Sequence, residues 1–290
     1  MSAVPKSRRP AVPRPATPRF FDGREGIVLR IPPSAFTFNG FRAWAKSDEL
    51  PENLRVCFVS GEIFLDLRGE DLDLDIPATA RTINGFRKWV KSDEFPDNVR
   101  VTFVNGEITL DMSQEELATH NKVKTEVMRV LGNLDPDAET GTLYTDGVLI
   151  SHEGAEVSNK PDGVYATRES RRAGRVRLVK RKGKAGQYLE IEGAPDWVME
   201  VVSDSSVTKD KRTLRKAYHK ASIREYWLID ARSPQIDFQI LVWRKKGYVA
   251  APKEGNWQHS PVFGRFFRLT RKKDPDGDWL YRLESQADAP

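Results

Sequence analysis

The chain has 290 residues, of which 39% are hydrophobic and 31% are charged, a balance typical of a globular protein in water. No segment approaches the roughly 18 consecutive apolar residues of a membrane-spanning helix, so we expect no contact with a membrane. Residues 1–19 contain five prolines and five Lys or Arg, where an export signal needs an apolar stretch. We therefore expect a cytoplasmic protein. The single cysteine, Cys57, fits a reducing compartment because it cannot form an internal disulfide.

The net charge of +5 is unevenly distributed along the chain. Besides the basic residues of 1–19, the stretch 168–184 holds nine Lys or Arg and one acid, Glu169. The rest of the chain is net acidic. Clustered positive charge of this kind can bind a phosphate backbone by releasing condensed counterions. A solvated hairpin would carry the same charge, so the charge alone leaves both interpretations open.

The N-terminal part combines a tail with an internal repeat. Residues 1–36 are predicted to be a disordered, basic, Pro-rich tail. The segment Thr37–Leu67 then recurs as Thr82–Met112, at an offset of 45 residues and with 21 of 31 positions identical. Two copies are too few for a solenoid, which needs about three or more. The sequence therefore indicates a local tandem duplication.

Each copy predicts a short helix followed by a hairpin. In the second copy, Phe86 and Trp89 are three residues apart, as one face of a helix requires. The acidic, Pro-containing stretch after them ends that helix. Asn105-Gly106 then lies between two β-rich runs, and Asn-Gly is a strong hairpin signal because both turn residues need positive φ. The first copy has the same features around Ser60-Gly61.

The remaining elements alternate between strands and helices. Apolar spacing predicts helices over Gln114–Leu134 and Lys209–Ala221. The predicted strands are Thr142–Ile150, Pro161–Thr167, Arg175–Arg181, Gln187–Ile191, Trp197–Val202, Glu225–Asp230 and Ile236–Trp243, with two short strands within Phe263–Leu283. This order predicts an α/β or α+β domain with a mixed central sheet flanked by helices.

Two acidic residues stand out by their context. Asp162 follows Pro161 at the start of a predicted strand, and Glu200 lies inside the apolar strand PDWVMEVV. An unpaired carboxylate in a buried strand is costly, so a proton, a basic side chain or a metal ion must compensate it. Two carboxylates on neighbouring strands suffice for Mg²⁺, which takes its other ligands from water and phosphate. The alternatives are a Pro-Asp turn for Asp162 and a buried ion pair for Glu200.

The sequence around these acids resembles a large bacterial restriction endonuclease family of the PD-(D/E)XK nuclease superfamily. The resemblance covers roughly residues 82–283 and rests on KPDGVYA, APDWVMEVVSDSSVTKD, EYWLID and FVNGEITLDM in the family order. It implies a restriction-endonuclease-like αβββαβ core with Asp162 and Glu200 as divalent-metal ligands. It also implies structural or site-adjacent roles for Glu107 and His120, although a histidine on a polar helix is more often a packing residue.

One feature departs from the family pattern. The usual signature places lysine where this chain has Val202, and the helix position that many relatives fill with lysine aligns with Leu214. We therefore expect the lysine on the following helix. Lys209, nearest the end of the Glu200 strand, is our choice, and the alternates are Lys211 and Lys216. Each of these lysines could also belong to the solvated side of the helix.

Together these observations predict a nuclease-like domain over residues 82–285 that includes the second repeat copy, preceded by the first copy at 37–81 and followed by a tail at 286–290. The expected activity is Mg²⁺- or Mn²⁺-dependent hydrolysis of DNA, without a small-molecule cofactor; a homodimer is left open. The basic residues expected to bind the DNA backbone are Arg171, Arg172, Arg175, Lys180, Arg181 and Lys182. Two alternatives stay open: an inactive nucleic-acid-binding protein of the same fold, and a protein-interaction scaffold that uses residues 37–112.

Overall fold

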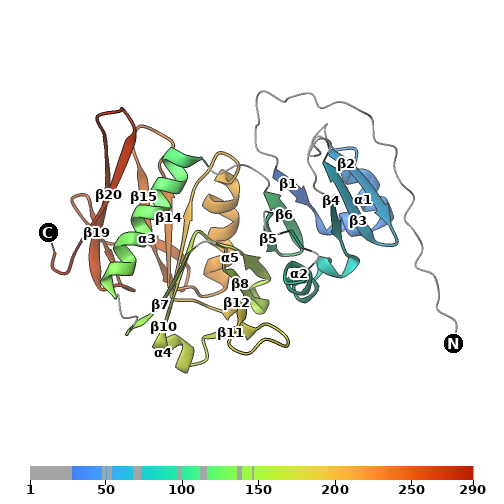
Figure 1. Ribbon diagram of the computed structural model, residues 1–290, viewed down its shortest axis with the longest axis horizontal. Helices are drawn as coiled ribbons and strands as arrows, with labels where there is room; N and C mark the ends of the chain where they lie inside the picture. The colour runs from blue at the N-terminus through green and yellow to red at the C-terminus, as the bar shows by residue number, and fades with distance from the viewer. Residues whose placement is uncertain are drawn as a thin grey trace.

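A computed structural model describes residues 28–47, 50, 54–67, 73–93, 95–96, 99–111, 116–135, 139–145 and 147–289. These residues form four β-sheets with a small number of helices between them (Figure 1). The two repeat copies lie on one side of the molecule, and the strands near the C-terminus lie on the other.

The central sheet is mixed and has six strands. Its order is β16 (Gly247–Ala250), β15 (Asp237–Arg244), β14 (Glu225–Asp230), β13 (Trp197–Val201), β10 (Gly163–Thr167) and β7 (Gly141–Thr145). β13 and β14 are parallel, whereas their other neighbours are antiparallel. Every residue of β13 and β14 is buried, as their nearly continuous apolar sequences predict.

Helices cover both faces of this sheet. On one face, Val123 and Val127 of α3 (Lys122–Leu134) pack in a core with Trp197 and Trp227. On the other face, Tyr218 of α5 (Arg215–Lys220) packs in a second core. Each helix continues from a wider π-helical turn, η3 (Leu117–Asn121) and η5 (Lys209–Leu214). The predicted α+β fold with a mixed sheet between helices is confirmed.

A seven-stranded sheet joins the repeats to the rest of the chain. Its order is β1 (Val28–Ile31), β6 (Glu107–Asp111), β5 (Arg100–Val104), β9 (Val157–Asn159), β8 (Leu149–His152), β12 (Tyr188–Gly193) and β11 (Val176–Lys180). The short helices η4 (Glu153–Ala155) and α4 (Arg168–Arg172) lie in its connections. A separate four-stranded sheet contains β17 (Lys253–Glu254), β18 (Trp257–Ser260), β19 (Arg265–Lys273) and β20 (Trp279–Gln286).

Both repeat copies fold as predicted, as a helix followed by a hairpin. The first copy forms η1 (Pro33–Phe36), α1 (Phe38–Trp44), β2 (Leu54–Val59) and β3 (Glu62–Leu67), and β3 also pairs with β4 (Asp73–Ile76). The second copy forms η2 (Ala78–Arg81), α2 (Ile83–Val90), β5 and β6. Both turn residues of each hairpin have positive φ: 53° and 90° at Ser60-Gly61, and 49° and 85° at Asn105-Gly106. The Asn-Gly signal therefore identified the turn correctly.

Three details differ from the sequence predictions. β1 and η1 lie within the tail expected at 1–36, because β1 finds a partner in β6, which local sequence cannot reveal; residues 1–27 lie outside the described residues. The strand predicted over Thr142–Ile150 is broken near Gly147, whose φ is 88°, and its halves β7 and β8 join different sheets. β20 continues to Gln286, one residue into the tail predicted at 286–290. The remaining domain boundaries stay predictions.

Candidate active site

A polar cleft lies where the seven-stranded sheet, the central sheet and the two π-helical turns meet. It encloses a narrow cavity of about 20 Å³, about the space of one water molecule or one ion. Its polar lining comes from strands and helices far apart in the sequence: Arg100, Thr102, Asp111, His120, Asn159, Lys160, Asp162, Glu200, Ser203, Ser206, Lys209 and Asp210. Four of the residues expected at or beside the site thus lie in one cleft: Asp162, Glu200, Lys209 and His120.

Asp162 lies immediately before β10, and its side chain is held from three directions. The Val201 N–H donates to Asp162 Oδ2 over 2.7 Å, which brings this carboxylate beside the backbone that follows Glu200. His120 Nε2 lies 3.5 Å from Oδ2, and Lys124 Nζ lies 3.6 Å from Oδ1. Burial alone would raise the pKa of Asp162, but the His120 and Lys124 contacts outweigh it and lower this pKa to about 2. Asp162 is therefore an ionised, buried carboxylate.

Glu200 has a different environment, which favours its protonated form. The Asn159 amide donates to Glu200 Oε1 over 2.9 Å, and the Tyr218 hydroxyl donates to the same atom over 2.6 Å. Thr102 fixes the Asn159 amide by donating to its Oδ1 over 2.6 Å. Burial and the nearby Asp210 carboxylate raise the pKa of Glu200 well above its ordinary value. A cation placed at the cleft would reverse that shift.

Lys209 and Asp210 enter the cleft from the first turn of η5. Only 18% of the Lys209 side chain is exposed, and its Nζ lies 3.6 Å from Asp210 Oδ1. Burial would lower the pKa of Lys209, but the carboxylates of Asp210 and Glu200 raise it, so its ammonium stays charged. Burial raises the pKa of Asp210, whose Oδ2 accepts a hydrogen bond from Ser206. Asp210 Oδ1 accepts no hydrogen bond from any part of the chain that the structure describes.

Three of the other residues named from the sequence lie outside the cleft. Lys211 Nζ is 2.7 Å from Asp230 Oδ2, and Lys216 is exposed on α5. Glu107 is next to the hairpin turn, at the end of β6 away from the cleft, and Asp111 at the other end lines the cleft instead. A strand of five residues separates its two ends by roughly 13–17 Å, so Glu107 does not line the cleft, and its structural or site-adjacent role stays a prediction.

Asp111 and Asp210 line the cleft but were not predicted from the sequence. Asp111 ends the apolar run of β6, an acid in the same kind of context as Glu200, so that signal was available. Asp210 is fully buried, yet it lies in a polar stretch where its burial leaves no sequence signal. Asn159 and Tyr218 were also missed, because neutral side chains become significant only through the carboxylate they touch.

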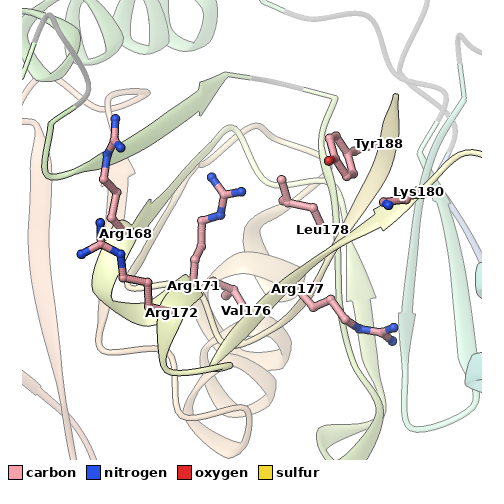
Figure 2. A pocket seen from close by; sticks show the side chains of 8 residues that line it. All are labelled: Arg168, Arg171, Arg172, Val176, Arg177, Leu178, Lys180 and Tyr188. Atoms are coloured by element: carbon pink, nitrogen blue, oxygen red, sulfur yellow. The ribbon is translucent and has the colours of Figure 1, made fainter. Parts of the chain in front are cut away.

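The basic stretch 168–184 forms α4, β11 and the loop towards β12. Arg168, Arg171, Arg172, Arg177, Lys180, Val176, Leu178 and Tyr188 line a shallow hollow of about 530 Å³. Figure 2 shows Arg168, Arg171 and Arg172 reaching up from α4, with Tyr188 and Lys180 on the opposite side. Arg171, Arg172 and Lys182 are exposed to solvent. This hollow is therefore cationic with an apolar floor.

Because this stretch lies between the strands of Asp162 and Glu200 in the sequence, we expected it to project beside the active site, and its position in the structure differs. α4 follows Thr167 at the end of β10, whereas Asp162 precedes the start of that strand. The stretch is therefore attached at the far end of the site strands, about 17 Å along β10 from Asp162. Two of the six basic residues expected to bind DNA are engaged elsewhere: Arg175 donates to the Ser222 carbonyl over 3.1 Å, and Arg181 contacts Asp93 at 3.3 Å.

The family resemblance implies a divalent metal, and the donors of the cleft fit one. Among the described residues, no group of three or more His, Cys, Asp or Glu side chains is arranged to hold a metal ion by itself. Mg²⁺, however, is commonly held by one or two carboxylates, with water and substrate phosphate as the other ligands. Asp162 and Glu200 supply those carboxylates, and Asp210 Oδ1 is a third buried oxygen without a hydrogen-bond donor in the described chain.

None of the helices that the structure describes combines the length and the apolar character that a membrane-spanning helix needs.

Comparisons with known proteins confirm the family. A family model described as "Putative restriction endonuclease", Uma2, matches residues 85–270, more than half of the chain. No curated protein matches the chain. A crystal structure of "a putative nuclease belonging to DUF820" from Anabaena variabilis ATCC 29413 is similar at 16% identity and a TM-score of 0.42, covering 63% of this chain and 90% of that chain. The segment that the family model matches begins inside the second repeat and contains the cleft residues from Asp111 to Asp210. The chain therefore belongs to the Uma2 family.

Proposed function

We propose that the chain is a metal-dependent nuclease that hydrolyses DNA phosphodiester bonds in this cleft. The observation that supports it best is the convergence of Asp162, Glu200 and the charged Lys209 on one cavity of about 20 Å³. A buried pair of carboxylates facing a buried ammonium is a costly arrangement for a purely structural role. It suits metal-assisted phosphodiester hydrolysis, in which a bound cation and a positive side chain both stabilise the charge that develops on the phosphate.

Asp162 and Glu200 would hold the metal, Mg²⁺ or Mn²⁺. When bound there, the ion would activate a water molecule and neutralise charge that builds up on the phosphate. His120 and Lys124 orient Asp162 and keep it ionised. Asn159 and Tyr218 fix Oε1 of Glu200, which leaves Oε2 outside this pair of hydrogen bonds.

Lys209 would act on the substrate itself. Its raised pKa keeps the ammonium protonated, so it donates hydrogen bonds and does not accept a proton. In this role it stabilises the additional negative charge on the non-bridging phosphate oxygens as the bond breaks. Asp210 holds the ammonium in place from 3.6 Å.

Cleavage of plasmid DNA by the full chain with Mg²⁺ or Mn²⁺ tests this proposal. Lys209→Met should lower the rate by about 10²-fold or more, since one transition-state donor is lost. Lys216→Met is the matched control, because this exposed lysine follows on the same helical segment without lining the cleft. Equal activity of the two variants would exclude Lys209 from the reaction.

Metal binding can be measured without activity, by calorimetry. Glu200→Gln should abolish Mg²⁺ binding and leave the fold intact or more stable, because a buried carboxyl with a raised pKa is replaced by a neutral amide. Binding by the unaltered chain should release protons, since a metal ligand must be deprotonated. Unchanged Mg²⁺ affinity in the variant would exclude Glu200 as a ligand.

The exposed cations around α4 would bind the DNA backbone on the flank of the cleft. A separation of about 17 Å along the sheet corresponds to about half a turn of B-form DNA, whose turn is about 34 Å. Changing Arg171, Arg172 and Lys182 together to Ala should flatten the slope of log affinity against log salt by up to about 3. The exposed Lys245 and Lys246, changed together to Ala, serve as a control.

The same measurements separate the two alternatives. Salt-dependent DNA binding without metal-dependent cleavage would indicate an inactive nucleic-acid-binding protein. The three partners that already surround Asp162 make this outcome chemically reasonable. The absence of any salt-dependent DNA binding would favour the interaction scaffold of residues 37–112.

A further inference from the structure

The hollow between α4 and the β11–β12 hairpin has both a cationic and an apolar lining. Among the described residues, those that line it include five Arg or Lys and no acid, around Val176, Leu178 and Tyr188. Its volume of about 530 Å³ lies within the range of about 300–1,000 Å³ that is usual for sites of organic ligands. A ligand that matches this lining is anionic in one part and flat and apolar in another.

A buried acid holds the cationic side of the hollow in place. Asp196 is fully buried, and its Oδ2 accepts hydrogen bonds from the Thr167 backbone N–H over 2.8 Å and from the Thr167 hydroxyl over 2.9 Å. Asp196 Oδ1 accepts another from the Ser170 hydroxyl over 2.7 Å. These contacts anchor the first turn of α4, whose exposed Arg171 and Arg172 line the hollow (Figure 2). A firmly held helix presents the two guanidiniums in a fixed direction, which reduces the entropy lost when they bind an anion.

The apolar side of the hollow belongs to the hairpin. Val176 is buried beneath it, and Leu178 and Tyr188 line it across from the arginines of α4 (Figure 2). Tyr188 is 48% exposed and lies directly opposite Lys180 in the β11–β12 register. An aromatic ring exposed to this extent offers a face on which another ring can stack, with an ammonium beside it.

The backbone of a DNA duplex would use only the cationic part of this lining. The bases of a duplex are stacked inside the helix, so a protein beside the backbone contacts phosphates and sugars. An unpaired nucleotide offers a phosphate together with an exposed base, and every base has a face that stacks on an aromatic ring. Proteins that bind single strands combine a positive groove with such rings. The lining of the hollow therefore matches an unpaired nucleotide better than a duplex.

We propose that the hollow binds an unpaired nucleotide of a DNA strand, with its base against Tyr188 and the adjoining phosphates on the arginines of α4. This inference rests on the proposed function, because it identifies DNA with a single-stranded segment as the substrate class of the cleft. The hollow starts at the end of β10, about 17 Å along this strand from Asp162, which corresponds to about five nucleotide steps of about 3.4 Å. A strand whose unpaired base lies in the hollow therefore reaches the cleft about five nucleotides away.

DNA binding without metal tests the base contact separately from cleavage. Two labelled single strands with the same number of phosphates are compared by fluorescence anisotropy in the presence of EDTA. One has about ten thymidines, and the other has abasic deoxyribose at every position. The full chain should bind the thymidine strand at least about 5-fold more tightly, since stacking on an aromatic ring contributes about this much per base.

Variants of Tyr188 assign that difference to the hollow. Tyr188→Ala should remove the preference for the thymidine strand and leave binding of the abasic strand nearly unchanged, because the arginines remain. Tyr188→Phe should keep the preference, since the ring and not the hydroxyl stacks on the base. Phe38→Ala is the matched control, because Phe38 is an exposed aromatic residue of the first repeat, outside the hollow. A preference that survives Tyr188→Ala would overturn the proposal.

Two other results would overturn the proposal as well. Equal affinity of the unaltered chain for the two strands would mean that phosphate contacts alone account for binding, and it would leave the proposed nuclease activity unaffected. Thymidine monophosphate bound as tightly as the thymidine strand would indicate a site for a free nucleotide. A chain that prefers the thymidine strand through Tyr188 but cleaves no DNA with Mg²⁺ or Mn²⁺ would instead contradict the proposed function and support the binding site.

Discussion

The two repeat copies have closely similar sequences in unequal surroundings. Phe103 of the second copy is 1% exposed against Phe86, whereas its counterpart Phe58 is only partly buried and stacks on Phe41. Val104 pairs with β9, whereas the equivalent Val59 is 52% exposed. The shared residues determine the local fold of each copy. The contribution of each residue to stability depends on what the rest of the chain places against it.

Among the charged residues, the two copies differ most at the equivalent arginines of their α-helices, Arg87 of α2 and Arg42 of α1. Arg87 is 8% exposed and contacts Glu190 over 2.5 Å and Glu192 over 3.1 Å. Lys91 also pairs with Glu190. The equivalent arginine of the first copy, Arg42, is exposed and lies over the Phe38 ring. The same side chain therefore joins two parts of the fold in one copy and lies in solvent in the other.

The largest expected difference between the copies is in the aromatic pair. Phe103→Ala should lower the free energy of unfolding by about 3–5 kcal/mol, since it leaves a cavity in a closed core. Phe58→Ala should lower it by about 1–2 kcal/mol, because this side chain is only partly removed from water. Urea denaturation of both full-length variants measures the two effects. Equal losses would mean that the first copy is as closely packed in solution as the second.

The arginine pair should give a smaller but still clear difference. Arg87→Ala should lower the free energy of unfolding by about 2–3 kcal/mol, below the usual 3–5 for a broken buried ion pair because Lys91 still compensates Glu190. Arg42→Ala should change it by less than about 0.5 kcal/mol. A double-mutant cycle of Arg87→Ala with Glu190→Gln measures the coupling. A coupling near zero would contradict the contact between these two residues.

The ion pairs of Glu190 with Arg87 and Lys91, which only the second copy makes, predict that the stability of the chain depends on pH. Burial raises the pKa of Glu190, but the hydrogen bonds from Arg87 and Lys91 outweigh it and lower this pKa overall. A carboxyl whose pKa is depressed in the folded state contributes stability above its unfolded pKa and loses this contribution as the pH falls. The difference in unfolding free energy between the unaltered chain and Glu190→Gln should therefore shrink from about pH 7 to about pH 3. A difference that stays constant over this range would contradict the lowered pKa.

The same contrast shows how far the sequence could predict the fold. Helix periodicity and the Ser60-Gly61 and Asn105-Gly106 turns are local signals, so both copies were predicted as helix and hairpin and are so in the structure. The partners of β1 and β5 were not predicted. β9 is three residues long, and the paired residues of β1 and β6 are 77–83 positions apart, so no local pattern encodes either pairing.

In the cleft, too, local features could be predicted from the sequence, whereas contacts between distant segments could not. Glu200 was identifiable because an acid in an apolar strand is costly unless it is compensated, whereas Asp162 was identified through the family resemblance. The residues that compensate them are His120 and Lys124 for Asp162, and Asn159 and Tyr218 for Glu200, and they come from separate segments. The family resemblance placed only His120 near the site; the types of the other three residues are common on any surface, so only the fold shows that they meet these acids. The roles of all these residues in catalysis remain predictions.

The smallest expected difference between the copies is at the first residue of each hairpin turn. Ser60 has φ 53° and Asn105 has φ 49°, so both adopt the left-handed conformation in the same type of turn. Asn tolerates this conformation better than Ser does.

Ser60→Asn should therefore raise the free energy of unfolding by about 0.5 kcal/mol, and Asn105→Ser should lower it by about the same amount. The Asn105 N–H donates to the Glu156 carbonyl over 2.9 Å, but this backbone hydrogen bond does not depend on the side chain and survives the exchange. The double variant, which swaps the two residues, should accordingly unfold with nearly the free energy of the unaltered chain. Chemical denaturation of the three variants measures these changes. A loss well above about 1 kcal/mol for Asn105→Ser alone would mean that this side chain contributes to the junction with β9, and that the two turns differ in more than backbone preference.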